Sequence, residues 1–344
     1  MTTAYYRPIP STDPARPEGA LTLAGGWTWF DRVEVLSRGE APRIVVAADL
    51  PDPVRHRLTA PRPPLAGLDL SRPNLMGILN TTPDSFSDGG KFNAPAAAIE
   101  HALEMVRDGA DILDVGGEST RPGAAYVSEG EEINRTAPII AAIRGELSAP
   151  ISIDTRKAAV AQAALEAGAD LVNDVYAFTH DPALAGVTAD AGAPVCLMHA
   201  QGDPEVMQDN PHYDDVLLDV YDFLEARIRV AEAAGINRAR IVVDPGIGFG
   251  KTRAHNLALL QRLSLFHGLG CAVLLGASRK RFIGVIGNAP DPLDRVHGSV
   301  AVALAGVAQG VQITRVHDIK ETKQALALWQ AVTLGQTEES SDEA

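Results

Sequence analysis

Eight short apolar runs recur between residues 74 and 316, and each is followed by a polar or glycine-rich turn and then by a stretch with helical periodicity. The runs are Leu75–Leu79, Ile112–Val115, Ile151–Ile153, Leu171–Val172, Val195–Met198, Ile241–Val243, Ala272–Leu275 and Val311–Val316. Continuous apolar strands that alternate with helices are typical of a parallel sheet, because the crossover helices bury its faces. Eight such units favour a closed TIM-type (β/α)₈ barrel; the count alone leaves a doubly wound open sheet as the alternative.

The segments between these runs are rich in alanine and leucine and have the spacing of helices. The clearest are Ala96–Asp108, Lys157–Ala167, Val216–Ala234 and Ser299–Ala308. Pro95 stands just before the first of them, where proline is well tolerated at a helix start. Gly109 and Gly168 suit helix carboxyl ends that lead into a strand. We therefore assign residues 66–334 to one barrel.

The first 65 residues differ from the rest of the chain. Ten of the 23 prolines lie there, and two strand-like runs stand out at Leu21–Leu36 and Arg43–Leu50. We interpret residues 1–65 as a β-containing extension with a proline-rich connector, and we expect it to pack against the barrel. Residues 335–344 are acidic, and we expect a solvated, disordered tail.

The composition excludes several classes of partner. Lys plus Arg is 30 and Asp plus Glu is 44, so the net charge of −14 disfavours sequence-independent binding to nucleic acid. No apolar run approaches the roughly 20 residues of a membrane span, and the amino terminus lacks a signal-peptide pattern. Cys196 and Cys271 lie in apolar runs and are predicted to be buried, reduced thiols. We expect a cytoplasmic enzyme.

Polar residues follow all eight runs, at the end of a barrel where active sites are built. They are Asn80, the loop at 116–121, Asp154, Asn173, His199, Asp244, Ser278, Arg279, Lys280, Arg315 and His317. One such residue would be an ordinary helix cap, but a cap does not need a cation. Three loops supply cations, and the loops after the seventh and eighth strands form the usual phosphate site of barrels. The pattern predicts a phosphorylated or pyrophosphorylated substrate.

Carboxylates and an amide converge at the same end. Asp154, Asn173 and Asp244 would suit a flat heterocycle with an amino-amidine edge, although the same set could hold a metal ion. Asp114 and Asp170 flank strands, and we expect them to be solvated or capping. The histidines expected on the surface are His101, His180, His255 and His267.

Several long segments resemble the signature blocks of the dihydropteroate synthases. The first is Met76–Gly90, MGILNTTPDSFSDGG, in which Thr81 stands where valine is commoner, and the second is Asp111–Gly123, DILDVGGESTRPG. Shorter blocks follow in the family's order at Ser152–Thr155, Asn173–Asp174, Met198–His199, Asp244–Lys251, Gly276–Lys280 and Arg315–Asp318. The resemblance covers about Leu68 to Trp329 and leaves out the extension.

This resemblance implies a reaction and its participants. The family condenses 6-hydroxymethyl-7,8-dihydropterin pyrophosphate with p-aminobenzoate, with Mg²⁺, and releases pyrophosphate and 7,8-dihydropteroate for folate biosynthesis. It commonly forms homodimers through helices near the carboxyl end, where Val300–Ala308 offers a small-residue apolar surface. Because the first two loops keep the family pattern, we expect ordinary sensitivity to sulfonamides. Those loops, Thr81–Phe92 and Gly117–Tyr126, are expected to close over the site.

The resemblance also implies the role of each site residue. The pterin is bound by Asp154, Asn173, Asp244 and Lys280, with Met198 and Gly276 lining its slot. Asn80 ligates Mg²⁺ on the pyrophosphate, which is held by Arg121, Arg315 and His317. The residues around p-aminobenzoate are Phe86, Thr120, Arg121, Pro122, Phe249, Ser278 and Arg279. The reaction step itself falls to Asp154, Lys280, Arg315, His317 and Arg121.

Two other functions share the expected barrel. A corrinoid-linked methyltetrahydrofolate methyltransferase binds a pterin on the same fold, but it would not be expected to carry the SFSDGG and GGESTRPG loops. A non-catalytic pterin-binding homologue would be marked by loss of Asn80, Lys280 or Arg315, and this sequence keeps all three.

Overall fold

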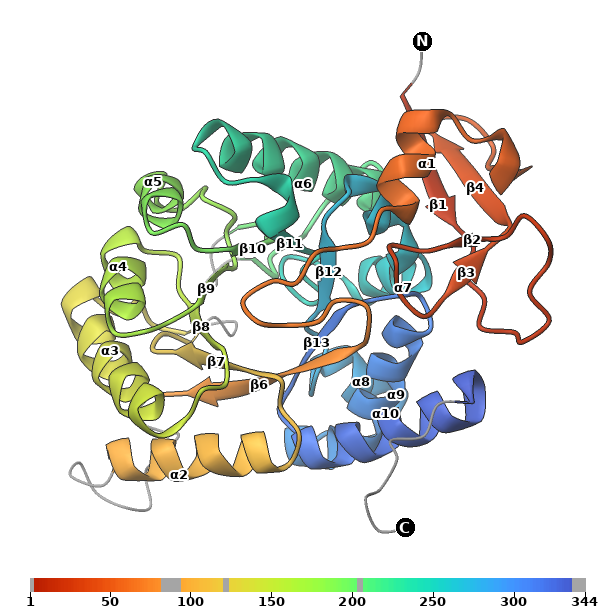
Figure 1. Cartoon of the computed structure of the whole chain (residues 1–344). Coiled ribbons are helices and arrows are strands. Elements are labelled where there is room, and N and C mark those ends of the chain that lie inside the picture. Colours follow the sequence, from red (N-terminus) through yellow and green to blue (C-terminus); the bar gives the residue numbers. More distant parts are fainter. Residues whose placement is uncertain (1–2, 82–93, 120–123, 203–206, 336–344) are drawn as a thin grey trace.

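A closed barrel of eight parallel strands forms the centre of the molecule, which confirms the predicted fold class (Figure 1). This computed structural model describes residues 3–81, 94–119, 124–202 and 207–335. The barrel strands are β6 (Asn74–Asn80), β7 (Ile112–Gly116), β8 (Ile151–Asp154), β9 (Leu171–Asp174), β10 (Val195–Met198), β11 (Ile241–Asp244), β12 (Ala272–Leu275) and β13 (Ile313–Val316). β13 pairs with β6 and closes the ring.

Helices cover the outside of the barrel. They are α2 (Ala94–Arg107), α3 (Glu129–Glu146), α4 (Ala158–Glu166), α5 (Ala183–Asp190), α6 (Val216–Ala233), α7 (Arg253–Gln261), α8 (Arg281–Ile286), α9 (Val296–Val307) and α10 (Ile319–Leu334). Short 3₁₀ turns lie at η3 (Arg238–Arg240), η4 (Leu263–Leu269) and η5 (Pro292–Arg295). Local sequence sets the helix starts: the Asp215 carboxylate accepts from the backbone N–H groups of Leu217 and Leu218 at the start of α6. Among the described residues no helix is long and apolar enough to cross a membrane.

The interior of the barrel is apolar at one end and polar at the other. Alternate strand residues point inward, and those nearest the strand starts include Met76, Ile112, Leu171 and Val242. Leu65, Leu68 and Leu70, from the segment before β6, pack into the same cluster. Figure 1 shows this segment crossing the barrel opening. The amino-terminal end of the barrel is therefore filled by hydrocarbon, and polar side chains gather at the carboxyl end.

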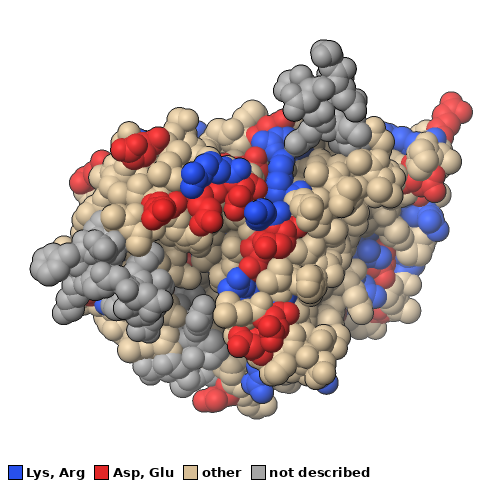
Figure 2. All heavy atoms as spheres, turned by 90° about the horizontal axis from the view of Figure 1, so that it is seen from below, with Lys and Arg blue, Asp and Glu red and all other residues tan. Residues whose placement is uncertain are grey.

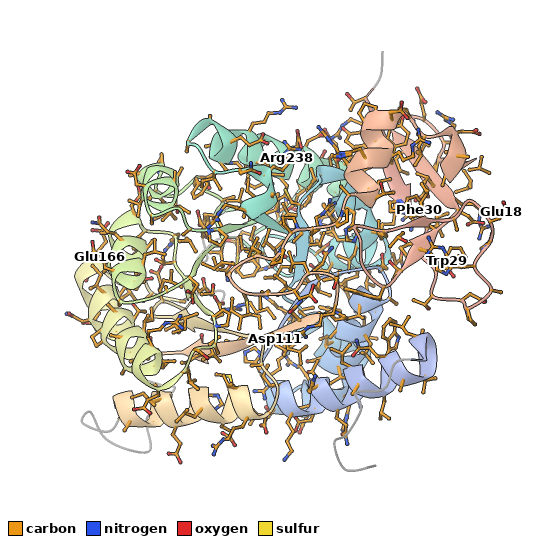
Figure 3. The ribbon with its side chains drawn as sticks, in the orientation of Figure 1. Glu18, Trp29, Phe30, Asp111, Glu166 and Arg238 are labelled. Atoms are coloured by element: carbon orange, nitrogen blue, oxygen red, sulfur yellow. The ribbon has the colours of Figure 1, made fainter. Side chains whose placement is uncertain are left out.

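The extension is a small β structure with its own core. β1 (Ala4–Pro8), β4 (Arg32–Ser37) and β5 (Arg43–Val46) form an antiparallel sheet, and β2 (Leu21–Thr22) pairs with β3 (Trp29–Phe30). Figure 3 labels Trp29 and Phe30, and Phe30 is fully buried in this core. β1 and the helix α1 (Asp52–Thr59) lie outside the strand-like runs predicted from the sequence. The prolines at 51 and 53 open this helix, at positions where proline needs no N–H partner.

Several contacts fasten the extension to the barrel. The Trp27 indole donates to the carbonyl of Val307 at 2.9 Å, and the Ser264 hydroxyl donates to that of Pro8 at 2.8 Å. Arg62 donates to the carbonyls of Cys271 and His267 at 3.1 and 3.2 Å. The whole of η4 is consequently buried.

The prediction that His267 lies on the surface is wrong, because this residue belongs to the buried η4 turn. Burial lowers the pKa of His267 to about 3, so the ring is neutral. The predicted burial of the cysteines is confirmed, since both thiols are buried and free. On the face shown in Figure 2, the coloured Lys and Arg side chains lie among Asp and Glu side chains, with no continuous basic patch.

Candidate active site

The carboxyl ends of the strands bring polar residues from distant parts of the chain to one opening. Asp154 ends β8, Asn173 lies on β9, Asp244 ends β11 and Arg315 lies on β13. All four occupy inward-facing positions of their strands, two residues beyond positions such as Ser152, Leu171, Val242 and Ile313. The alternation of strand residues therefore places these four side chains in one layer, above the apolar residues that fill the amino-terminal end of the barrel.

The Arg315 guanidinium is held between two carboxylates. Its Nε lies 2.5 Å from Asp114 Oδ2, and its Nη2 lies 2.7 Å from Asp154 Oδ2. Asp114 Oδ2 also accepts from Asn173 Nδ2 at 3.1 Å. These bonds join β7, β8, β9 and β13 across the barrel. Charge-assisted hydrogen bonds of this kind are shorter and stronger than neutral ones, so the layer is a rigid unit.

The expectation that Asp114 is solvated or capping is wrong. It is 0% exposed and takes part in the layer just described. Asp114 sits two residues after the inward-facing Ile112 on β7, so its side chain also points into the barrel. The alternation from Ile112 was the signal that could have revealed it, because an inward carboxylate needs a cation partner.

Burial shifts the ionisation of these acids. It raises the pKa of Asp154, an effect that Arg315 opposes and the charge of Asp114 reinforces. Burial also raises the pKa of Asp244 to about 6, although the backbone N–H of Gly246 and the charge of Lys280 lower it. Burial alone would lower the pKa of Arg315, but Asp114 and Asp154 outweigh that effect and raise it. At neutral pH one fixed cation serves two buried carboxyl groups.

An apolar wall stands beside this polar layer. Met198 packs with Val175 and Tyr176, and Phe249 packs against them. The Lys280 ammonium lies 4.0 Å from the centre of the Phe249 ring, in a cation–π contact. Gly276 brings the backbone close to Asp244, because a Cβ there would lie 3.5 Å from Asp244 Oδ2. A flat ring can thus meet carbon atoms on its face and polar groups at its edge.

The loops after β12 and β13 contribute a second group of polar residues. Ser278 Oγ accepts from the backbone N–H of His317 at 3.2 Å and lies 3.0 Å from its Nδ1. Arg279 has a left-handed backbone, with φ of 57°, and its guanidinium pairs with Asp318. Ser278 and His317 are therefore neighbours, while the Arg279 side chain is committed to an ion pair.

Four of the predicted site residues, Phe86, Thr120, Arg121 and Pro122, lie outside the described residues, and so does most of the first loop. Asn80 is half-buried at the end of β6, in register with Gly116 of β7. It therefore lies at the same end of the barrel as Asp154, which is the register partner of Gly116 on β8.

Lys251 is a buried lysine whose role the sequence did not reveal. Its ammonium donates to the carbonyls of Gly246, Phe249 and His199 at 2.9, 3.0 and 3.2 Å and lies 2.8 Å from His199 Nδ1. Burial lowers its pKa to about 7. Gly246 has φ of 68°, and a Cβ there would collide with the carbonyl of His199. Lys251 thus holds the loop after β11 against the loop after β10 and sets the position of Phe249.

Comparison with known proteins agrees with this geometry. A family model described as pterin binding enzyme matches residues 76–317. The chain belongs to this family of pterin binding enzymes, among the dihydropteroate synthases. The Synechocystis dihydropteroate synthase is 49% identical over 262 residues, which is 75% of this chain and 91% of that protein. The family match begins inside β6, and the extension precedes it.

Solved structures give the same result. The Xanthomonas albilineans dihydropteroate synthase with 4-aminobenzoic acid has a TM-score of 0.75 and 47% identity, and the match covers 80% of this chain and 98% of that one. The Yersinia pestis enzyme in a sulfonamide complex has a TM-score of 0.73 and 48% identity over 77% of this chain and 96% of that one.

Proposed function

We propose that this barrel opening joins 6-hydroxymethyl-7,8-dihydropterin pyrophosphate to p-aminobenzoate, forming 7,8-dihydropteroate and pyrophosphate. The observation that carries the proposal is the layer in which Arg315 bonds to Asp154 and Asp114, and Asn173 bonds to Asp114, next to Asp244 and Lys280. Carboxylate oxygens accept hydrogen bonds from an amidine-like edge, and the ammonium donates to a ring acceptor. Met198 and Gly276 line the slot for the ring.

The second substrate and the leaving group belong at the loops after β12 and β13. Phe249, Ser278 and Arg279 would surround p-aminobenzoate, and Arg315 and His317 would hold the pyrophosphate. The aryl amine is neutral at pH 7, so no side chain has to activate it for attack. As the C–N bond forms, the C–O bond to pyrophosphate breaks, and the proton lost by the nitrogen passes to the released pyrophosphate or to water. What the chain must supply is stabilisation of the departing negative charge and exclusion of water, which is catalysis by fixed charges and positioning.

A divalent cation fits this arrangement through the oxygen of Asn80. Among the described residues there is no cluster of three or more His, Cys, Asp or Glu side chains suited to a metal. Mg²⁺ is often bound by one or two protein oxygens together with substrate phosphates, so a single amide ligand at the end of β6 is compatible with a substrate-borne ion. When bound, Mg²⁺ would neutralise charge on the pyrophosphate group.

A coupled assay tests the function. The purified protein is mixed with dihydropterin pyrophosphate, p-aminobenzoate and Mg²⁺, and pyrophosphate and dihydropteroate are followed together. We expect equal amounts of both products, inhibition by a sulfonamide that competes with p-aminobenzoate, and an Asn80→Ala variant that needs about tenfold more Mg²⁺, equivalent to about 1.4 kcal/mol. Pyrophosphate without dihydropteroate would mean another acceptor. Absence of both, with the pterin still bound, would point to a non-catalytic homologue.

We also propose a homodimer that buries the surface of α8, α9 and α10, which lie side by side in Figure 1. Val285 and Ile286 of α8 are exposed, as are Ala301 and Ala305 of α9. Leu328 and Val332, one turn apart on α10, are 62% and 85% exposed. Apolar side chains gathered on neighbouring helices are typical of an interface between protein chains.

Sedimentation velocity tests the dimer. The double variant Leu328→Lys, Val332→Lys is expected to sediment as a monomer, because it places four charges in a twofold interface. Gln324→Lys on the same helix is the control, and it is exposed and polar already. A monomeric wild-type protein would refute the proposal.

A further inference from the structure

We infer that Asp114 is a positioning residue, which fixes the plane of the Arg315 guanidinium and the orientation of the Asn173 amide for the pterin substrate. This inference rests on the proposed pterin site. Asp114 was assigned no role by the sequence motifs, yet one of its oxygens, Oδ2, holds both neighbours, at 2.5 Å from Arg315 Nε and 3.1 Å from Asn173 Nδ2.

The contact with Asn173 decides which face of the amide the substrate meets. An asparagine side chain carries a donor and an acceptor on opposite sides, and its orientation follows its hydrogen-bond partners. Because a carboxylate can only accept, Asp114 draws the NH₂ group toward itself. The carbonyl oxygen of Asn173 is then turned away from Asp114. It can join Asp154 as a second acceptor for N–H donors on the heterocycle, and a ring that presents acceptors there is rejected.

The contact with Arg315 fixes the cation. Nε is tied to Asp114 and Nη2 to Asp154, and two bonds from different nitrogens define the plane of a rigid guanidinium. Asp114 is 0% exposed, so water does not compete for this bond. Truncating a buried partner of this kind usually costs more than losing a surface ion pair.

The charge of Asp114 also acts on Asp154. The charges of four groups act on the Asp154 carboxyl, namely those of Arg315 on β13, Asp114 on β7, Glu132 on α3 and Asp174 on β9. Arg315 stabilises the charged form of Asp154, and the three acids oppose it. Removing the negative charge at position 114 must therefore lower the pKa of Asp154 and extend pterin binding to lower pH. If the side chain at position 114 only filled space, its substitution would leave the pKa of Asp154 unchanged.

Two substitutions separate charge from position. Asp114→Asn keeps the shape and one oxygen acceptor but removes the charge, whereas Asp114→Glu keeps the charge but displaces it by one methylene. For Asp114→Asn we expect kcat/KM for dihydropterin pyrophosphate to fall about 100-fold, KM for p-aminobenzoate to stay within about threefold, and the acidic limb of the pH profile to move to lower pH. For Asp114→Glu we expect a similar loss with a wild-type pH profile. Asp170→Asn is the control, since Asp170 pairs with Arg144 at the start of β9, outside the polar layer.

The outcomes distinguish this inference from the proposed function. If the wild-type protein makes no dihydropteroate, the proposed function has failed. If the wild type is active and Asp114→Asn keeps both the kinetics and the pH profile, only the role of Asp114 is refuted. Should Asp114→Asn not fold, Asp114→Glu still decides: an unchanged kcat/KM for the pterin substrate would refute the positioning role. A parallel loss for both substrates would indicate a structural role instead.

Discussion

Replacing Lys280 by alanine is expected to lower kcat/KM for dihydropterin pyrophosphate by about 100- to 1,000-fold, the usual effect of removing one preorganised electrostatic group from an active site. Lys280 carries a cation over the Phe249 ring, and its charge lowers the pKa of Asp244. Without it, the pterin loses a donor and the pKa of Asp244 rises above about 6, so less carboxylate is present near neutral pH. The acidic limb of the pH profile is expected to move to higher pH, opposite to the effect at Asp114.

Steady-state kinetics between pH 5 and 9, with circular dichroism to confirm the fold, measure this effect. Lys320→Ala on α10 is the matched control, because Lys320 is exposed and outside the polar layer. A Lys280→Ala enzyme with wild-type kcat/KM would remove Lys280 from the pterin site and would leave the fold assignment intact.

The largest effect on stability is expected at Lys157. This lysine is 1% exposed, and its ammonium lies 2.6 Å from Glu132, 3.2 Å from Glu118 and 2.6 Å from the carbonyl of Val127. Lys157→Met would leave the Glu132 carboxylate buried without its cation. We expect the free energy of unfolding to fall by about 3–5 kcal/mol, as for other broken buried ion pairs.

The pH dependence identifies the cause. Burial already raises the pKa of Glu132, against the effect of Lys157, and loss of the lysine raises it further. A raised acid pKa destabilises the fold at pH values above the unfolded pKa, and this cost disappears once the group is protonated in both states. The difference in the free energy of unfolding between the variant and the wild type, measured in urea, should therefore become smaller as the pH falls toward about 4. Arg229→Met removes an exposed ion pair with Glu225 and should cost less than about 1 kcal/mol. Equal losses in both variants would contradict the explanation.

The barrel and the location of its polar opening could be predicted because both follow from repeated local patterns. Each inward strand position has a short-range signal, and the carboxyl ends of parallel strands meet whatever the loops do. Asp114 was misread because a single acid inside an apolar run resembles a capping residue until its partner, 201 residues away at Arg315, is known. His267 was misread for a similar reason, since the extension that covers it lies more than two hundred residues earlier in the chain.

The segment with Leu65, Leu68 and Leu70 has a consequence for how the protein unfolds. These side chains fill the amino-terminal end of the barrel, although they belong to the segment that joins the extension to β6. Unfolding of the extension would expose the core of the barrel, and unfolding of the barrel would expose the apolar side chains of the joining segment. Tyr5 and Leu36 of the extension also belong to the main core of the barrel, so the barrel interior is not complete without the extension. The two regions therefore form one cooperative unit, and heat or denaturant should melt them in a single transition.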